Sequence, residues 1–137
     1  MKVRGTGILD TNAVILLPRL TDTAALPEAP TITSITLAEL SVGPLVATTD
    51  AERAARQAHL QQAEADFDPI PFDAAAARAF GRVAADLRSA GRKTSARAYD
   101  ALIAAIAISA DLPLHTTNPD DFTGIRGLRV ISVPRPA

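Results

Sequence analysis

Four polar residues lie where a short apolar segment ends or a helix is expected to begin: Asp10, Glu39, Asp100 and Asn118. Oxygen-bearing side chains without histidine or cysteine are the ligands that hard divalent cations such as Mg²⁺ and Mn²⁺ prefer. A bound cation can activate a water and stabilise the leaving oxygen of a phosphodiester, which carboxylates alone would repel. Metal-dependent hydrolysis of a phosphodiester is therefore a candidate chemistry.

Asp100 gives the strongest reason to expect a site. It lies in residues 98–108, the most apolar segment of the chain. An ionised carboxylate in such surroundings costs several kcal/mol unless a cation compensates it. Because no lysine or arginine occurs between Arg97 and Arg126, we expect the compensating charge to come from a residue distant in sequence or from a metal ion shared with the other acids.

The other three residues also have purely structural interpretations. Asp10 is suited to cap a helix. Glu39 follows Thr36 with the spacing of a capping box. Asn118, which precedes Pro119, is typical of a helix start. We nevertheless favour a shared site, because the elements expected around these residues would bring them to one edge of a sheet.

Apolar and β-branched runs predict five short strands, at residues 7–9, 31–35, 67–72, 112–117 and 128–133. Helices are expected between them, with starts capped by Thr36, Thr49, Asp73 and Ser95. Strands that alternate with helices imply a parallel sheet covered by helices on both faces. Ligands of such sheets bind beyond the carboxyl ends of the strands, which is where we expect the four polar residues.

The 137-residue chain is expected to form a single domain, residues 1–137. The absence of cysteine excludes disulfides and thiolate metal sites. The longest uninterrupted apolar run, 101–108, is far shorter than the ~20 residues of a membrane helix, and the N-terminus has no apolar run of signal-peptide length. We therefore expect a soluble cytoplasmic protein that does not enter a membrane.

The net charge of −1 gives no general attraction for a polyanion. Four of the fourteen basic residues nevertheless fall within ten positions, at Arg88, Arg92, Lys93 and Arg97. One interpretation of this basic stretch is a solvated turn between helices. The other is a set of contacts with the phosphates of a phosphodiester substrate beside the acidic residues.

The same residues carry a resemblance to a known family. Asp10-Thr11-Asn12, the helix start 36–40, the segment 100–105 (Asp-Ala-Leu-Ile-Ala-Ala) and the segment 112–122, which ends in Asn-Pro-Asp-Asp-Phe, resemble a PIN-domain ribonuclease in order and spacing. The most similar members would be VapC toxins of type II toxin–antitoxin (VapBC) pairs. The resemblance covers nearly the whole chain and implies a PIN-like three-layer α/β/α sandwich, with a central, mainly parallel sheet of four to five strands.

The resemblance also implies a function. It indicates an endoribonuclease that cleaves RNA with Mg²⁺ or Mn²⁺, in which Asp10, Glu39 and Asp100 are the catalytic, metal-binding acids. Asn118 matches a position that is often Asp, which would leave the site one charge poorer, and Asp121 would be an outer or second-metal ligand. The expected supporting residues are Thr11, Asn12, Thr116, Asn118 and Asp121. A homodimer and a small VapB-type antitoxin are the expected partners.

Thr117 is a second departure from the family, besides Asn118, and three alternative functions remain open. Members often carry Arg where this chain has Thr117, so one RNA contact is missing. A catalytically silent PIN-like module that binds RNA or antitoxin without cutting would suit Asn118. A phosphoryl-transfer receiver or phosphatase would need a lysine near its acids, and the chain has only Lys2 and Lys93. A dinucleotide-binding fold would need a glycine-rich turn after its first strand, not before it. His115 could touch substrate, which is the less favoured interpretation.

Overall fold

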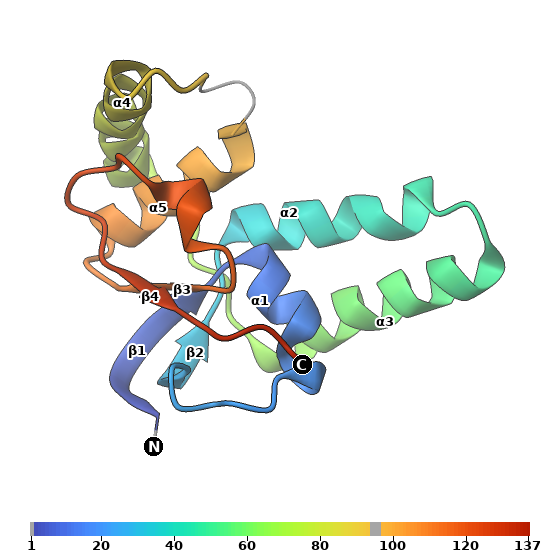
Figure 1. Cartoon of the computed structure of the whole chain (residues 1–137). Coiled ribbons are helices and arrows are strands. Elements are labelled where there is room, and N and C mark those ends of the chain that lie inside the picture. Colours follow the sequence, from blue (N-terminus) through green and yellow to red (C-terminus); the bar gives the residue numbers. More distant parts are fainter. Residues whose placement is uncertain (1, 94–96) are drawn as a thin grey trace.

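The computed structural model describes residues 2–93 and 97–137, and these form a four-stranded parallel sheet with the order β2-β1-β3-β4 (Figure 1). The strands are β1 (Val3–Leu9), β2 (Pro27–Thr31), β3 (Leu114–Thr116) and β4 (Val130–Ser132). Ile8 of β1 is in register with Thr31 on one side and with Leu114 on the other. The predicted parallel sheet is confirmed.

Five α-helices and the three 3₁₀ turns η1, η2 and η4 surround this sheet in the part of the chain that the structure describes. The helices are α1 (Thr11–Leu16), α2 (Ser34–Val42), α3 (Asp50–Asp66), α4 (Ala74–Ser89) and α5 (Ala98–Ser109), and the 3₁₀ turns are η1 (Leu17–Arg19), η2 (Gly43–Val46) and η4 (Pro119–Phe122). The caps expected at Thr49 and Asp73 are confirmed, because their side chains accept hydrogen bonds from the backbone N–H groups of Glu52 and Ala76. The cap expected at Ser95 lies outside the described residues.

Two apolar clusters lie on opposite faces of the sheet, because successive side chains of a strand point in opposite directions. Ile8 packs into one cluster with buried residues of α4 and α5. Its neighbour Leu9 packs into the other cluster, with residues of α1, α2 and α3. Helices therefore cover both faces, and the predicted three-layer sandwich is confirmed.

The second predicted strand was placed too late in the sequence. β2 ends at Thr31, and Thr33 is the N-cap of α2, with its hydroxyl accepting a 3.3 Å hydrogen bond from the N–H of Thr36. The capping-box interpretation of Thr36 and Glu39 was therefore wrong by one helical turn. The strand forms earlier in the sequence than predicted because proline is tolerated in an edge strand. β2 is an edge strand and contains both Pro27 and Pro30.

The predicted strand at 67–72 does not form. In its place, Ile70 makes a single bridge, in which its N–H donates to Ile32 O and its carbonyl accepts from Ser34 N, both at 2.9 Å. Pro69 and Pro71 lack the N–H groups that a longer ladder needs.

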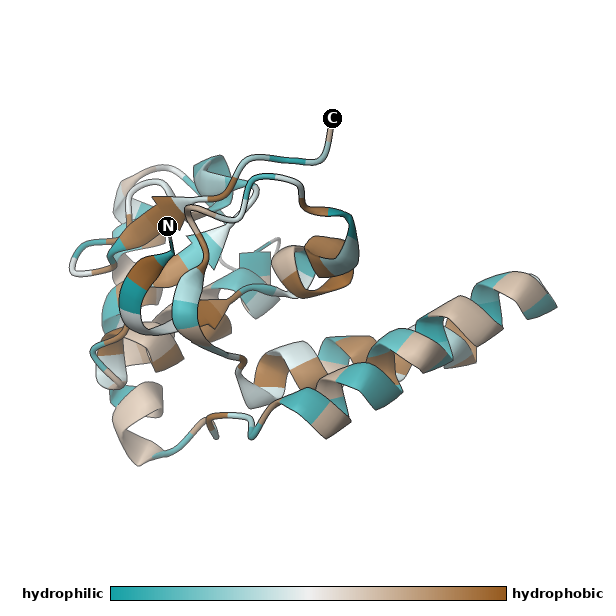
Figure 2. Cartoon of the chain, turned by 90° about the horizontal axis from the view of Figure 1, so that it is seen from below, coloured by the Kyte–Doolittle hydropathy of each residue, from teal (hydrophilic) through white to brown (hydrophobic). Residues whose placement is uncertain are grey.

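Helices α2 and α3 run side by side away from the sheet in both orientations of the molecule (Figures 1 and 2). The end of α2 and the turn that follows it expose Val42, Leu45 and Val46. Within the described part of the chain, none of the helices combines the length and apolar character required to span a membrane.

Candidate active site

Asp10 follows β1 directly and is almost fully buried, with an exposed fraction of 4%. Its Oδ1 accepts a 2.9 Å hydrogen bond from the N–H of Ala13, so it does cap α1. Its Oδ2 accepts a hydrogen bond from the hydroxyl of Thr116, at the end of β3. Capping and participation in a site are thus compatible for this carboxylate, because its two oxygens serve different partners.

Glu39 lies in the second turn of α2 and faces the start of α1. Its Oε1 accepts a 2.7 Å hydrogen bond from the hydroxyl of Thr11. The hydroxyl of Thr36 lies 3.0 Å from that of Thr11. Thr11 therefore supports Glu39, whereas the hydroxyl that supports Asp10 belongs to Thr116.

Asp100 lies in the first turn of α5 and is half-buried. The expectation of a compensating charge from a distant residue or a metal was incomplete, because Nη1 of Arg97 lies 3.9 Å from Asp100 Oδ2. The same Nη1 makes a closer ion pair with Asp121 in η4. One guanidinium is thus divided between two carboxylates from different elements.

The acids act on one another electrostatically. The pKa of Asp100 is raised to about 6, first by burial and then by repulsion from Asp121, Asp10 and Glu39, against an opposing effect of Arg97. The pKa of Asp10 is also raised, mainly by burial, although its two hydrogen bonds oppose the shift. Burial likewise raises the pKa of Glu39, with a further contribution from Asp10. These carboxylates form one cluster of excess negative charge, which we call the acidic cluster: Asp10, Glu39, Asp100 and Asp121.

Asn118 connects this cluster to the C-terminal segment. Its Nδ2 donates a 2.8 Å hydrogen bond to Asp121, and its Oδ1 accepts a 3.1 Å hydrogen bond from Nη2 of Arg135. Asn118 is the N-cap residue of η4, so the predicted helix start is confirmed, although its side chain makes no capping hydrogen bond there. An amide suits this position because it donates to a carboxylate and accepts from a guanidinium.

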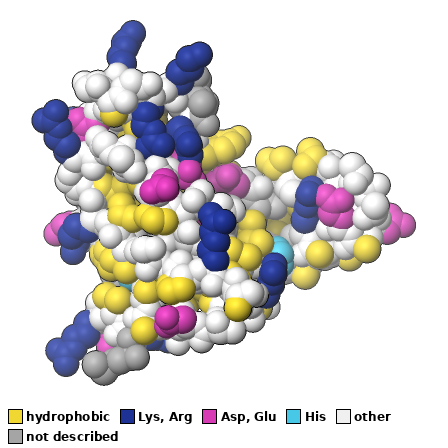
Figure 3. All heavy atoms as spheres, viewed as in Figure 1, with side chains coloured by type: hydrophobic (Ala, Val, Ile, Leu, Met, Phe, Trp, Pro, Cys, Tyr) yellow, Lys and Arg dark blue, Asp and Glu magenta, His cyan; other side chains and the backbone are white. Residues whose placement is uncertain are grey.

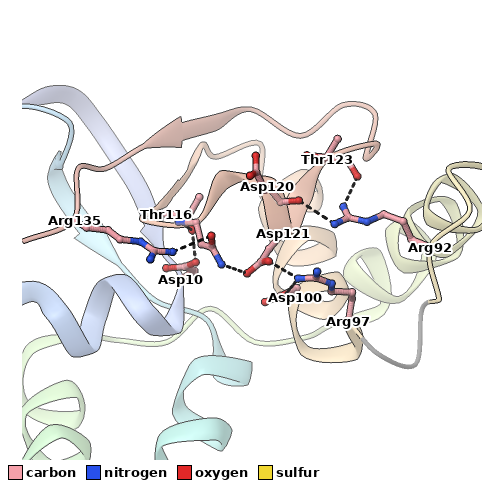
Figure 4. Close-up of polar contacts among 10 residues, drawn as sticks. Asp10, Arg92, Arg97, Asp100, Thr116, Asp120, Asp121, Thr123 and Arg135 are labelled. Carbon is pink, nitrogen blue, oxygen red and sulfur yellow. Dashed lines mark hydrogen bonds and ion pairs between the residues drawn. The ribbon is translucent and has the colours of Figure 1, made fainter.

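Two cations of the basic stretch bind the segment that carries Asp121. Arg92 donates to the carbonyl oxygens of Thr123 and Asp120, at 2.8 and 3.0 Å, and Arg97 contacts the acids directly. Arg88 and Lys93 are exposed. Figure 4 shows Asp10, Asp100 and Asp121 between Arg97 on one side and Arg135 on the other. The stretch is therefore more than a solvated turn.

Arg135 is the site residue that sequence reasoning missed. Its Nε donates a 3.3 Å hydrogen bond to the carbonyl oxygen of Thr117, beside Asn118. The strand order could have indicated Arg135. Because β4 is a parallel neighbour of β3, the residues after β4 leave the sheet at the same edge as those after β3. Asn12, an expected supporting residue, is exposed near this segment and not joined to the acids by any hydrogen bond among the described residues.

His115 cannot touch a substrate in this structure, because its exposed fraction is 0%. Its Nδ1 lies 2.6 Å from the carbonyl oxygen of Ala25, which defines it as the protonated nitrogen, and burial lowers the pKa of the ring. Its buried Nε2 has no hydrogen-bond partner among the described residues. The ring packs over Gly7, where there is no Cβ to obstruct it.

As placed, no three His, Asp or Glu side chains within residues 2–93 and 97–137 could hold a metal ion together. Carboxylate oxygens of Glu39 and Asp10 accept hydrogen bonds from neighbouring hydroxyls, and Asp100 forms an ion pair with Arg97. The possible metal ligands are carboxylates that repel one another. A hard divalent cation prefers oxygen ligands of this kind, and its charge would relieve their repulsion.

Comparison with known proteins adds the following findings. Residues 8–128 match the family model of the PIN domain. The chain is 39% identical to Ribonuclease VapC5 of Mycobacterium tuberculosis over 131 residues, 94% of either protein. It is 38% identical to Ribonuclease VapC8 of the same species over 103 residues, 75% of this chain and 91% of the relative.

A solved structure matches over a similar extent. The crystal structure of VapBC-5 from Mycobacterium tuberculosis, described as a member of the VapBC family of toxin-antitoxin systems, superposes with a TM-score of 0.81 and 38% sequence identity. The match covers 93% of this chain and 98% of that one.

Proposed function

Because the chain belongs to the PIN domain family and groups there with the VapC proteins, we propose that it is a divalent-metal-dependent endoribonuclease and the toxin of a toxin–antitoxin pair. The observation that carries the proposal is the acidic cluster. Burial and mutual repulsion raise the pKa of Asp100 to about 6 although Arg97 lies beside it. Such a cluster is suited to bind a cation, which would offset its repulsion of the phosphodiester that is cleaved.

The donor types present fit Mg²⁺ or Mn²⁺, and because no three of these side chains in the described residues are placed to hold an ion together, they would have to move closer to one another to bind it. Asp10, Glu39 and Asp100 would hold the ion, and Asp121 and Asn118 would serve an outer or second position. When bound, the ion would supply an activated water and stabilise charge on the phosphoryl oxygens. The chain's own part is orientation: Thr116 fixes Asp10, and the hydroxyl of Thr11 fixes Glu39.

The basic side chains complete the proposed binding surface. Arg92 and Arg97 border the acidic cluster on the side of α4 and α5. Figure 3 shows acidic side chains gathered on this face with basic side chains on both sides of them. Phosphates on either side of the cleaved bond could thus meet a guanidinium while the acids hold the cation.

The relatives support a partner as well. VapBC-5 is a member of a toxin-antitoxin family, so we propose that this chain binds a VapB-type antitoxin. A homodimer, cytoplasmic location and a chain composed of a single domain remain expectations from the sequence.

The alternative function is a silent module that binds RNA without cutting. Asn118 favours it, since an amide removes one potential metal-binding charge.

Cleavage of a labelled RNA by the purified protein, with Mg²⁺, with Mn²⁺ and with a chelator, separates these functions. We expect cleavage only with metal and its loss in Asp100→Asn. The matched control is Asp68→Asn, which neutralises an exposed carboxylate that forms no hydrogen bond or ion pair through its side chain in the described part of the chain. Binding without metal-dependent cleavage would favour the silent module. Cleavage that survives the chelator or the Asp100 substitution would overturn the proposal.

A further inference from the structure

A hollow of about 350 Å³ lies beside the acidic cluster, and the proposed function leaves it unassigned. It is lined by Asn12, Leu16, Arg19, Thr117, Arg135 and Pro136. These residues come from α1, η1, the end of β3 and the C-terminal segment. The hollow adjoins the site, because Arg135, which lines it, donates to Asn118, and Asn118 in turn donates to Asp121 of the acidic cluster.

In the described part of the chain, the two arginines of this hollow are not neutralised by a carboxylate in contact with them, unlike five of the other ten arginines. Arg53, Arg56, Arg97, Arg126 and Arg129 each make an ion pair with a carboxylate. Within the residues that the structure describes, neither Arg19 nor Arg135 has such a partner within 4.0 Å. Two guanidinium groups that line one hollow without a carboxylate in contact supply positive charge there, beside the negative charge of the acidic cluster.

Arg135 is also held in place. Its Nε and Nη2 donate to Thr117 O and Asn118 Oδ1, and these bonds use two of the five N–H donors of a guanidinium. Three donors remain for a ligand. A guanidinium that is already oriented loses less entropy when it binds a planar or tetrahedral anion. The combination of a fixed Arg135 and a nearby Arg19 therefore favours a phosphate group.

We propose that this hollow is a nucleotide subsite, in which Arg19 and Arg135 bind an RNA phosphate next to the one that is cleaved. The inference rests on the proposed ribonuclease function and extends it. Arg135 and Arg97 lie on opposite sides of Asp10 and Asp121 in Figure 4, so the RNA backbone would cross the acidic cluster between cations. Leu16 and Pro136 supply apolar surface for a ribose or base, as expected of a groove that tracks a single strand.

Binding of a fluorescent single-stranded oligoribonucleotide, measured by anisotropy in chelator over a series of KCl concentrations, tests the subsite without cleavage. The slope of log K against log salt is negative, and for single-stranded RNA each lost phosphate contact reduces its steepness by about 0.7. We therefore expect a less steep slope for Arg19→Gln and for Arg135→Gln, and a decrease in steepness of about 0.7 for the double variant, which loses the contact with the one proposed phosphate. Arg135→Lys should keep the slope but weaken binding, because an ammonium group lacks the guanidinium fork.

The matched control is Arg4→Gln, which removes the same charge from an exposed residue near the opposite end of β1. Because Arg135 also fixes the C-terminal segment, Arg19→Gln tests the subsite through a residue without that role. Unchanged affinity and slope in the double variant, or no RNA binding by the wild type at low salt, would overturn the subsite. So would loss of antitoxin binding alone, since the hollow would then serve an acidic protein segment.

The subsite and the proposed function can fail separately. If Asp100→Asn still cleaves RNA, the assignment of the acidic cluster is wrong, whereas the salt slopes still measure the arginine contacts. If the slopes do not respond to Arg19 and Arg135 but cleavage requires metal, only the subsite is wrong.

Discussion

Replacement of Asp100 by Asn should stabilise the protein in the absence of metal, and the size of the effect follows from the electrostatics of the acidic cluster. The pKa of Asp100 is about 6 in the folded protein and 3.8 as an ordinary aspartate. A difference of about 2 pKa units corresponds to about 3 kcal/mol. Asp100 is near the N-terminus of α5, where a negative charge is favourable by about 0.5 kcal/mol, so the net gain is somewhat smaller.

The sign of the pH dependence is fixed by the direction of the shift. The folded state holds the Asp100 proton more tightly than the unfolded state, so between the two pKa values the free energy of unfolding falls as pH rises. Below the ordinary pKa of 3.8 the group is protonated in both states and costs nothing. The advantage of Asp100→Asn should therefore be small at low pH, grow through about pH 4 to 6, and reach its maximum above that range.

Urea denaturation in chelator, at about pH 5 and about pH 8, measures this difference directly. Asp68→Asn is the control, because its exposed carboxylate lies outside the acidic cluster, and it should change stability little at either pH. A gain that is the same at both pH values would mean that Asp100 is not destabilised by its charge. A loss of stability at about pH 8 would refute the reasoning, since it would show that Arg97 compensates Asp100 fully.

Three further variants test neighbouring parts of the structure. Gly7→Ala should destabilise the fold by roughly 1–3 kcal/mol in urea denaturation, because the added Cβ would lie 2.4 Å from Nε2 of His115; an unchanged midpoint would contradict this packing. Asn118→Asp should lower stability without metal and increase the rise in melting temperature with Mn²⁺, because a carboxylate cannot donate to Asp121 but can bind a cation. Asp10→Ala should cost about 1 kcal/mol as a lost helix cap and should also remove most of the Mn²⁺-induced rise in melting temperature, whereas an intact metal response would leave capping as its only role.

The acids and most helix boundaries could be predicted because their signals are local. Thr49 and Asp73 cap helices through hydrogen bonds to the third residue after each of them, so the spacing is visible in the sequence. Alternation of short apolar runs with helices implied a parallel sheet, and a parallel sheet gathers the residues that follow its strands at one edge. The sequence pattern by itself therefore predicts that Asp10 and Asn118 lie at the same edge.

The position of the second strand in the sequence depended on tertiary contacts. The β-branched run at 31–35 is compatible with a strand or with a helix start, and only the edge position of β2 allowed the proline-containing segment to pair instead. Thr33 then became free to cap α2. Local pattern alone could not decide between these outcomes, because β structure is stabilised mainly by the neighbours that a strand meets.

The residue types and their order along the chain determined that a cluster of carboxylates would form at the carboxyl edge of a parallel sheet. Only the tertiary structure decided how its charge is balanced. Arg97 reaches both Asp100 and Asp121 because α5 and η4 converge, and Arg135 returns to Asn118 because β4 lies beside β3. Electrostatic pairing depends on distance in space and on burial, and neither quantity is encoded in the separation of these residues along the sequence.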